Sequence, residues 1–144
     1  MTYYSFEELE VWQKAYKLAV RIYRLLKGCR DYGLRDQMTR ASVSIASNIA
    51  EGAERDSVAD FVRFLHIAKG SAAELKTQLY IACDVNIIPE SKKDDLINDI
   101  ENISKMLHGL IKALKKDSKT RLSVKLQFSQ GRCRWVSFLP PATA

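Results

Sequence analysis

The sequence predicts an all-α protein, an antiparallel up-down-up-down four-helix bundle followed by a C-terminal tail. Apolar residues recur every three or four positions in four separate segments, which is the period of an amphipathic helix. Before residue 120, no segment alternates with the period of two that is typical of strands. Short connections marked by Gly or Pro separate the four segments, and short connections favour antiparallel neighbours. With 144 residues, the chain is long enough to bury a core in one bundle.

The first helix carries two adjacent apolar seams. We expect it to begin at Ser5, whose hydroxyl can cap free backbone N–H groups while Glu8 reaches back, and to end at Gly28. Together the seams form a face broader than a two-stranded coiled coil requires. One seam consists of Leu9, Trp12, Tyr16, Ala19, Tyr23 and Leu26, and the other of Val11, Ala15, Leu18, Ile22 and Leu25.

The second helix is predicted to start between Asp31 and Leu34 and to end at Gly52. Small residues crowd its middle, and they allow a neighbouring helix to approach closely. Polar residues also gather on one side of it, which is compatible with a buried hydrogen-bond network, a subunit contact or a ligand site. These polar residues are Arg40, Ser44, Ser47, Asn48 and Glu51.

Capping pairs mark the next two helices. Ser57 with Asp60 is expected to cap the third helix, and Ser91 with Asp94 the fourth, which follows Pro89. The apolar line of the third helix is Phe61, Phe64, Leu65, Ala68, Ala72, Leu75, Leu79 and Ala82. That of the fourth is Leu96, Ile100, Ile103, Leu107, Leu110 and Leu114.

The chain divides into a bundle over residues 5–116 and a tail over residues 117–144. In the tail, apolar residues at positions 122, 124, 126 and 128 alternate with polar ones, as in a strand. The turn-forming residues at 129–131 could lead into a second strand over 132–138. A β-hairpin and a disordered tail are the two alternatives, because an isolated hairpin is only marginally stable in water.

The formal charge of +6 is unevenly distributed. Residues 1–111 contain 15 Lys and Arg against 16 Asp and Glu, whereas residues 112–144 contain 8 basic residues and one acidic residue. No acidic residue lies between Glu10 and Asp31, so we expect the basic stripe on the first helix to lack local neutralisation. Such a surface binds phosphate backbones through counterion release, although an ordinary solvated face would also be polar. The stripe consists of Lys14, Lys17, Arg21 and Arg24.

A second candidate for nucleic-acid binding is the basic and aromatic C-terminal region. Basic residues attract phosphates, and aromatic or guanidinium planes stack on unpaired bases. A solubilising tail, or an arm that packs on another subunit, would account for the same composition. The candidate residues here are Lys112, Lys115, Lys116, Lys119, Arg121, Arg132, Arg134 and Trp135, with Lys125, Phe128 and Phe138 interleaved.

The sequence contains no motif typical of an enzyme, a cofactor site or a metal site. His66 and His108 have no partner at metal-ligand spacing, and glycine-rich phosphate-binding motifs are absent. Three widely spaced cysteines are typical of free thiols in a reducing compartment. We find no apolar run long enough to span a membrane and no signal peptide, so we expect a cytoplasmic protein.

Three segments resemble a known family. Residues 6–15 (FEELEVWQKA), 40–52 (RASVSIASNIAEG) and 64–79 (FLHIAKGSAAELKTQL) are similar to the four-helix-bundle proteins encoded in intervening sequences of bacterial 23S ribosomal RNA genes. The resemblance covers about residues 5–116. It implies a ring-like homo-oligomer, commonly a pentamer, without enzymatic activity. The family includes the accessory variability determinant of diversity-generating retroelements, which binds nucleic acid and partners a reverse transcriptase on its template RNA.

These observations lead to three functional hypotheses. The first is a non-enzymatic, oligomeric scaffold that binds RNA or DNA through backbone contacts, as an accessory subunit of a reverse-transcriptase or other ribonucleoprotein complex. The second is a structural homo-oligomer or protein-interaction module without a nucleic-acid role. The third is an unrecognised enzyme or ligand-binding protein that uses the polar middle of the second helix.

Overall fold

The described part of the chain is helical, as predicted. The structure, a computed structural model, describes the backbone of residues 5–129 and the side chains of residues 5–119. Within these residues there is no strand. The elements are the 3₁₀-helix η1 (Phe6–Glu8) and the α-helices α1 (Glu10–Leu25), α2 (Tyr32–Ala53), α3 (Val58–Asp84) and α4 (Glu90–Ser129).

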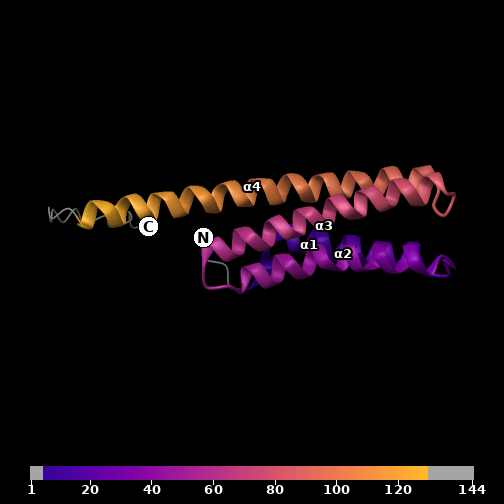
Figure 1. The fold of residues 1–144 in the computed structure, drawn as a ribbon, viewed down its shortest axis with the longest axis horizontal. Helices are drawn as coiled ribbons and strands as arrows, with labels where there is room; N and C mark the ends of the chain where they lie inside the picture. The colour runs from indigo at the N-terminus through magenta and orange to yellow at the C-terminus, as the bar shows by residue number, and fades with distance from the viewer. Residues whose placement is uncertain (1–4, 130–144) are drawn as a thin grey trace, which may run out of the picture.

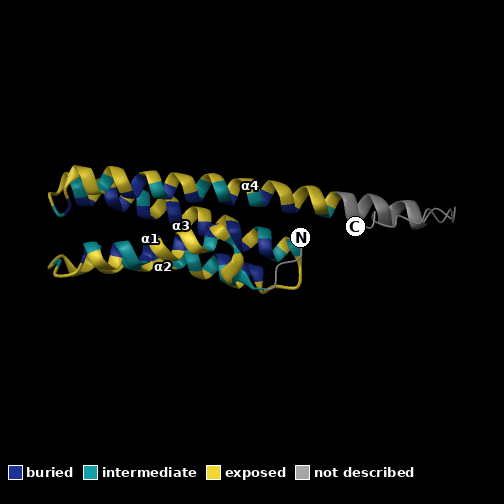
Figure 2. Ribbon diagram, turned by 180° about the vertical axis from the view of Figure 1, so that it is seen from behind, coloured by how far each residue is buried: buried dark blue, intermediate teal, exposed yellow. Residues whose placement is uncertain are grey.

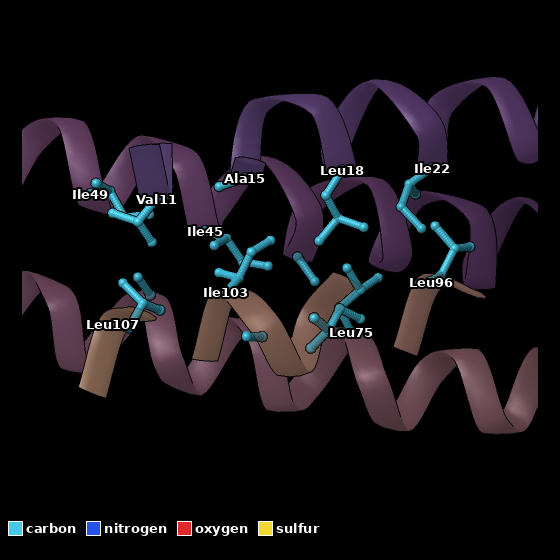
Figure 3. Close-up of a cluster of buried hydrophobic side chains, with 14 of the residues drawn as sticks. Val11, Ala15, Leu18, Ile22, Ile45, Ile49, Leu75, Leu96, Ile103 and Leu107 are labelled. Atoms are coloured by element: carbon cyan, nitrogen blue, oxygen red, sulfur yellow. The ribbon is translucent and has the colours of Figure 1, made fainter. Parts of the chain in front are cut away.

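The four helices form an antiparallel bundle. Each α-helix packs against its neighbour in the chain, and α1 also packs against α4, which closes the up-down-up-down arrangement. In the close-up of the core, Ile22 and Leu96 meet at one end, while Val11 and Leu107 lie at the other (Figure 3). α4 is longer than its partners and continues past the end of the other three helices (Figure 1).

The core is built from one side of each helix. On α1, the seam that contains Leu18 and Ile22 points into the bundle, together with Ile45 of α2, Leu75 of α3 and Ile103 of α4 (Figure 3). The predicted apolar line of α3 is fully buried, and that of α4 is buried apart from a half-buried leucine at position 110. Buried and exposed residues therefore alternate with the helical period along each element (Figure 2).

The beginning of the first helix differs from the prediction. Ser5 caps the short η1 helix by accepting a hydrogen bond from the backbone N–H of Glu7, instead of forming a capping box with Glu8. Leu9 then adopts an extended conformation, and α1 begins after it without a side-chain cap. Gly28 lies in the following turn with φ of +85°, a conformation that glycine adopts readily.

The contact between α2 and α3 is close because small residues line it. α2 begins within the predicted range, and the side chain of Asp31 caps it by accepting a hydrogen bond from the N–H of Leu34 at 3.0 Å. Near the other end of α2, a Cβ atom added to Gly52 would lie 2.6 Å from Cβ of Phe64 and 3.0 Å from Cδ2 of Phe61. The glycine therefore allows the two helices to approach here.

Of the two predicted caps on α3 and α4, one is confirmed and one is wrong. Ser57 caps α3 by accepting a hydrogen bond from the N–H of Asp60 at 3.0 Å. Ser91, by contrast, lies inside the first turn of α4, which begins one residue earlier. The carbonyl oxygen of Pro89 accepts hydrogen bonds from the N–H groups of Lys92 and Lys93, both at 3.1 Å, so the helix starts directly after the proline.

The strand predicted over residues 122–128, and the disordered alternative for the tail, are not found in residues 117–129, which are helical as the last part of α4. Neither Gly nor Pro occurs between positions 110 and 130, so nothing in the sequence interrupts the helix. A helix also satisfies its backbone hydrogen bonds internally, whereas a lone strand needs a partner. The predicted second strand at 132–138 lies outside the described residues.

Candidate nucleic-acid interface

The basic stripe on α1 is partly neutralised, contrary to the prediction. The ammonium group of Lys14 lies 3.2 Å from the carboxylate of Glu10, one helical turn earlier. Arg21 forms ion pairs with both Asp95 and Asp99 of α4. Glu10 is the one acidic residue of α1, but the antiparallel packing also brings the acidic beginning of α4 beside the C-terminal half of α1.

Two residues of the stripe remain free to bind a phosphate. Lys17 and Arg24 are exposed, and neither forms an ion pair with any other residue of the described part of the chain. Lys27 and Arg30, at the end of α1 and in the turn after it, are likewise exposed and without an ion pair among the described residues. The accessible positive charge is therefore displaced toward the C-terminal end of α1.

Arg24 borders two pockets at this end of the bundle. One has a volume of about 590 Å³ and lies between α1 and α2. The other has a volume of about 400 Å³, lies between α1 and α4, and includes Arg21 and Lys92 in its lining. The sequence did not point to Arg35 of α2 or Lys92 of α4, because nothing in α1 shows which residues of other helices will lie next to it.

The basic residues predicted at the C-terminal end of the bundle are not brought together with those of α1. The four whose side chains are described, Lys112, Lys115, Lys116 and Lys119, are exposed. Since Val11 lies at the same level as Leu107, these lysines are near or beyond the N-terminal end of α1, opposite to Arg24 (Figures 1 and 3). Arg121 belongs to α4, but its side chain is outside the description, as are Arg132, Arg134 and Trp135 entirely.

The polar middle of α2 is occupied by structural hydrogen bonds. The hydroxyl groups of Ser44 and Ser71 lie 2.9 Å apart and link α2 to α3. The amide of Asn48 donates to the carbonyl and the hydroxyl oxygens of Ser44, at 2.7 and 2.9 Å. Arg40 and Ser47 are exposed and lie outside this network. These contacts correspond to the hydrogen-bond-network interpretation of the sequence pattern.

An apolar groove between η1, α1 and α2 is the main feature that the sequence did not reveal. It has a volume of about 520 Å³, and we call it the Trp12 groove. The Trp12 ring is stacked on Tyr16 with centroids 5.5 Å apart and makes an edge contact with Phe6 at 5.1 Å. Tyr16 is 53% exposed. The remaining lining residues are Ala19, Val20, Tyr23, Arg24, Val43, Ala46, Ser47 and Ala50.

Within the described residues, no three His, Cys, Asp or Glu side chains converge as a metal site would require. None of the described helices is long and apolar enough to cross a membrane. Cys29 and Cys83 are half-buried free thiols.

Comparisons with known proteins place this fold in a family. A family model described as 23S rRNA-intervening sequence protein matches residues 7–109. The chain belongs to this family. A crystal structure of a protein with unknown function from the S23 ribosomal protein family of Bacteroides thetaiotaomicron VPI-5482 is similar, with 31% sequence identity and a TM-score of 0.67. The match covers 71% of this chain and 98% of that chain. The comparison with curated proteins finds no match.

The family match confirms the resemblance drawn from the three sequence segments. The part shared with the 23S rRNA-intervening sequence proteins contains α1 to α3 and α4 as far as residue 109. It includes the α1 stripe, the two pockets beside Arg24 and, apart from Phe6, the lining of the Trp12 groove. Lys112 and the basic residues that follow it lie beyond the matched region.

Proposed function

We propose that this protein is a non-enzymatic scaffold that binds RNA or DNA through the phosphate backbone. The observation that carries the proposal is a group of exposed cations that extends from the middle of α1 to the turn after it and has no ion-pair partner among the described residues, namely Lys17, Arg24, Lys27 and Arg30. Lys17 and Arg24 belong to a rigid helix and Lys27 and Arg30 to the turn after it, and unpaired cations held in this way can contact phosphates at a low ordering cost. The family description, which refers to 23S rRNA, supports an RNA-associated role.

The scaffold is, in this proposal, a homo-oligomer. The Trp12 groove exposes aromatic surface on a helix pair, and exposed apolar patches mark interaction sites in soluble proteins. A second copy of the chain seated in this groove would cover Tyr16 and Val43.

The number of five subunits rests on the family resemblance, as does a role as accessory subunit of a reverse transcriptase or another ribonucleoprotein complex. A cytoplasmic location agrees with the free thiols of Cys29 and Cys83.

The test compares two double variants that remove the same charge from α1. Lys17→Gln with Arg24→Gln removes unpaired cations, whereas Lys14→Gln with Arg21→Gln removes paired ones. Fluorescence anisotropy with labelled RNA, over a salt titration, gives the affinity and its salt dependence. We expect the first variant to flatten the salt slope by up to about 0.9 for each lost duplex-phosphate contact, and the second to change it less. Equal effects of the two variants would contradict the assignment.

Truncation after Lys116 separates the α1 region from the C-terminal one. It removes five basic residues, at positions 119, 121, 125, 132 and 134, but no part of the described core, whose last member in α4 is Leu114. We expect the truncated protein to retain binding, because the unpaired α1 cations remain. If truncation abolishes binding while the Lys17 and Arg24 double variant binds normally, the C-terminal region is the binding element.

The Trp12 groove also favours the alternative of a structural homo-oligomer without a nucleic-acid role. The anisotropy measurement decides between the two. An oligomer that binds neither RNA nor DNA at low salt would support this alternative and contradict the nucleic-acid proposal.

A further inference from the structure

The pocket between α1 and α2 combines cations with an exposed aromatic ring. Its volume of about 590 Å³ is within the range of small-ligand sites. One side is formed by the end of α1 and the turn after it, and the other by the first two turns of α2. We call it the Tyr23 pocket. Its lining residues are Tyr23, Arg24, Leu26, Lys27, Gly28, Arg35, Asp36 and Thr39.

The charge in this pocket favours an anion. Three of its lining side chains are cationic and one is anionic. The single carboxylate, that of Asp36, accepts hydrogen bonds from Nε and Nη2 of Arg35 at 3.0 and 2.9 Å. Arg24 and Lys27 have no ion pair with any described residue, so their charges remain available to a phosphate group.

Arg35 is held in a fixed orientation. Its guanidinium carbon lies 4.8 Å from the centroid of the Tyr32 ring, a cation–π contact, while the same group donates to Asp36. A guanidinium restrained on two sides presents a preorganised planar surface and loses little conformational entropy when a ligand binds.

Tyr23 supplies the second planar surface. It is 56% exposed, although its ring is large and largely apolar. An aromatic ring next to unpaired cations is the combination with which proteins bind single-stranded nucleic acid, where the base stacks on the ring and the phosphate meets the cations. In a duplex, the faces of the bases are covered by their neighbours and cannot reach such a ring.

We propose that the Tyr23 pocket binds an unpaired nucleotide of single-stranded RNA or DNA, with the base stacked on Tyr23 and its phosphate held by Arg24 and Lys27. This inference rests on the proposed nucleic-acid function and narrows it to strands with unpaired bases. Tyr23 and Arg24 also border the Trp12 groove. A second copy seated in that groove must therefore leave the Tyr23 ring accessible.

The experiment measures the affinity of the full chain for a labelled single-stranded RNA of roughly 12 nucleotides, and for the duplex of the same sequence. We expect Tyr23→Leu to weaken binding of the single strand by about tenfold, because stacking on the ring is lost, and to change duplex binding by less than about twofold. Tyr23→Phe should bind like the wild type. Tyr80→Leu is the matched control, since Tyr80 is an exposed tyrosine of α3 outside the pocket.

Two results would overturn the inference while leaving the proposed function intact. In the first, the wild type binds the single strand and the duplex with equal affinity and Tyr23→Leu changes neither. In the second, Tyr23→Leu weakens binding of the single strand and of the duplex by the same factor. A wild-type protein that binds neither ligand would overturn both proposals. If Tyr23→Leu alters the oligomer mass, its weaker binding could result from the changed assembly. Cross-linking of thiouridine-substituted RNA to the wild type then tests directly whether the RNA lies in the Tyr23 pocket. Cross-links to residues 22–39 support the pocket, and cross-links confined to α4 exclude it.

Discussion

Gly52 lies where α2 comes closest to α3, so the effect of adding one methyl group can be predicted at this position. We expect Gly52→Ala to destabilise the protein, because the new Cβ would lie 2.6 Å from Phe64 Cβ and 3.3 Å from the backbone oxygen of Phe61. Overpacking of this kind costs about 1–3 kcal/mol, offset by about 1 kcal/mol of helix propensity. Urea unfolding monitored by circular dichroism measures the net change.

Gly70 is the matched control for this substitution. It lies inside α3, and a Cβ added there meets no atom within 4 Å. Gly70→Ala should therefore have only the effect of the higher helix propensity of alanine, and raise the free energy of unfolding by about 0.5–1 kcal/mol. Equal effects of the two substitutions would mean that the close approach at Gly52 does not exist in solution.

The ion pair between Lys76 of α3 and Glu101 of α4 makes part of the stability depend on pH. Lys76 Nζ and Glu101 Oε1 lie 2.8 Å apart. The hydrogen bond from Lys76 lowers the pKa of Glu101, and the same bond raises the pKa of Lys76. The contribution of Glu101 to the free energy of unfolding is thus present above the unfolded-state pKa of this carboxyl group. It is lost as pH falls through the lowered pKa of the folded state. That of Lys76 is lost as pH rises through its raised pKa.

We therefore expect Glu101→Gln to be less stable than the wild type near neutral pH, and the difference to disappear in acid, where the wild-type carboxylate is protonated as well. Urea midpoints measured across the acid range test this. Glu54→Gln is the control, since Glu54 is exposed and has no ion pair in the described part of the chain. A stability difference that persists below the Glu101 pKa would show that the carboxylate charge is not its cause.

Among single residues, the sequence predicted some of the local contacts and none of the distant ones. The predicted cap of Ser57 involves a partner three residues away and is confirmed, and α2 starts within the predicted range, capped by Asp31. The neutralisation of Arg21 could not be predicted, because its partners are more than seventy residues away and become neighbours only through the packing of α1 on α4. Arg21 was misjudged for this reason, whereas the pairing of Lys14 with Glu10 is local to α1 and was missed as well.

The contact between α1 and α4 gives Arg21 a role in joining two elements. We expect Arg21→Gln to lower the free energy of unfolding by about 1 kcal/mol, the upper range for partly exposed ion pairs, because it releases Asp95 and Asp99 together. Lys17→Gln should change it by less than about 0.5 kcal/mol, since Lys17 has no partner among the described residues. Thermal and urea unfolding of both variants, at low and high salt, measure the difference.

The Arg21 effect should also shrink at high salt, because ions screen exposed charges. A loss of stability from Lys17→Gln as large as that from Arg21→Gln would contradict the assigned ion pairs.

At the level of elements, the four helices were predictable because each has a continuous apolar line with the helical period. Their ends were less predictable. Nothing in the sequence predicts the break at Leu9 between η1 and α1. Ser5, which is suited to capping a helix and precedes an acidic segment, predicts only that a helix begins near it. In α4, alternation at positions 122–128 resembles a strand, yet the absence of Gly and Pro between positions 110 and 130 favours continuation of the helix.

The whole molecule has an apolar surface that no single helix could reveal. Both seams of α1 were apparent in the sequence, but periodicity alone does not show which seam enters the core. The seam of Leu18 and Ile22 does so, which leaves Trp12, Tyr16 and Tyr23 beside α2 in the Trp12 groove. A groove of this composition on a small bundle is the physical basis for proposing a homo-oligomer.

Val43 tests this proposal, because it lies in the groove and is 40% exposed in the isolated protomer. In a monomer, the carboxylate of Val43→Glu can reach water, so the fold should be retained. In an oligomer whose subunits meet at the groove, the same carboxylate would be buried without a partner, which is strongly unfavourable. We expect the mass in light scattering at micromolar concentration to fall from a multiple of the protomer mass of 16.4 kDa to the protomer mass itself.

Ile67→Glu provides the matched control, since Ile67 is 44% exposed on α3 and does not line the Trp12 groove. It introduces the same charge on the same kind of surface, and we expect it to keep the wild-type mass. The monomeric Val43→Glu protein should also bind RNA more weakly, because one strand can no longer contact several subunits at once. A wild-type monomer, or a Val43→Glu protein with unchanged mass, would exclude the groove as the subunit contact.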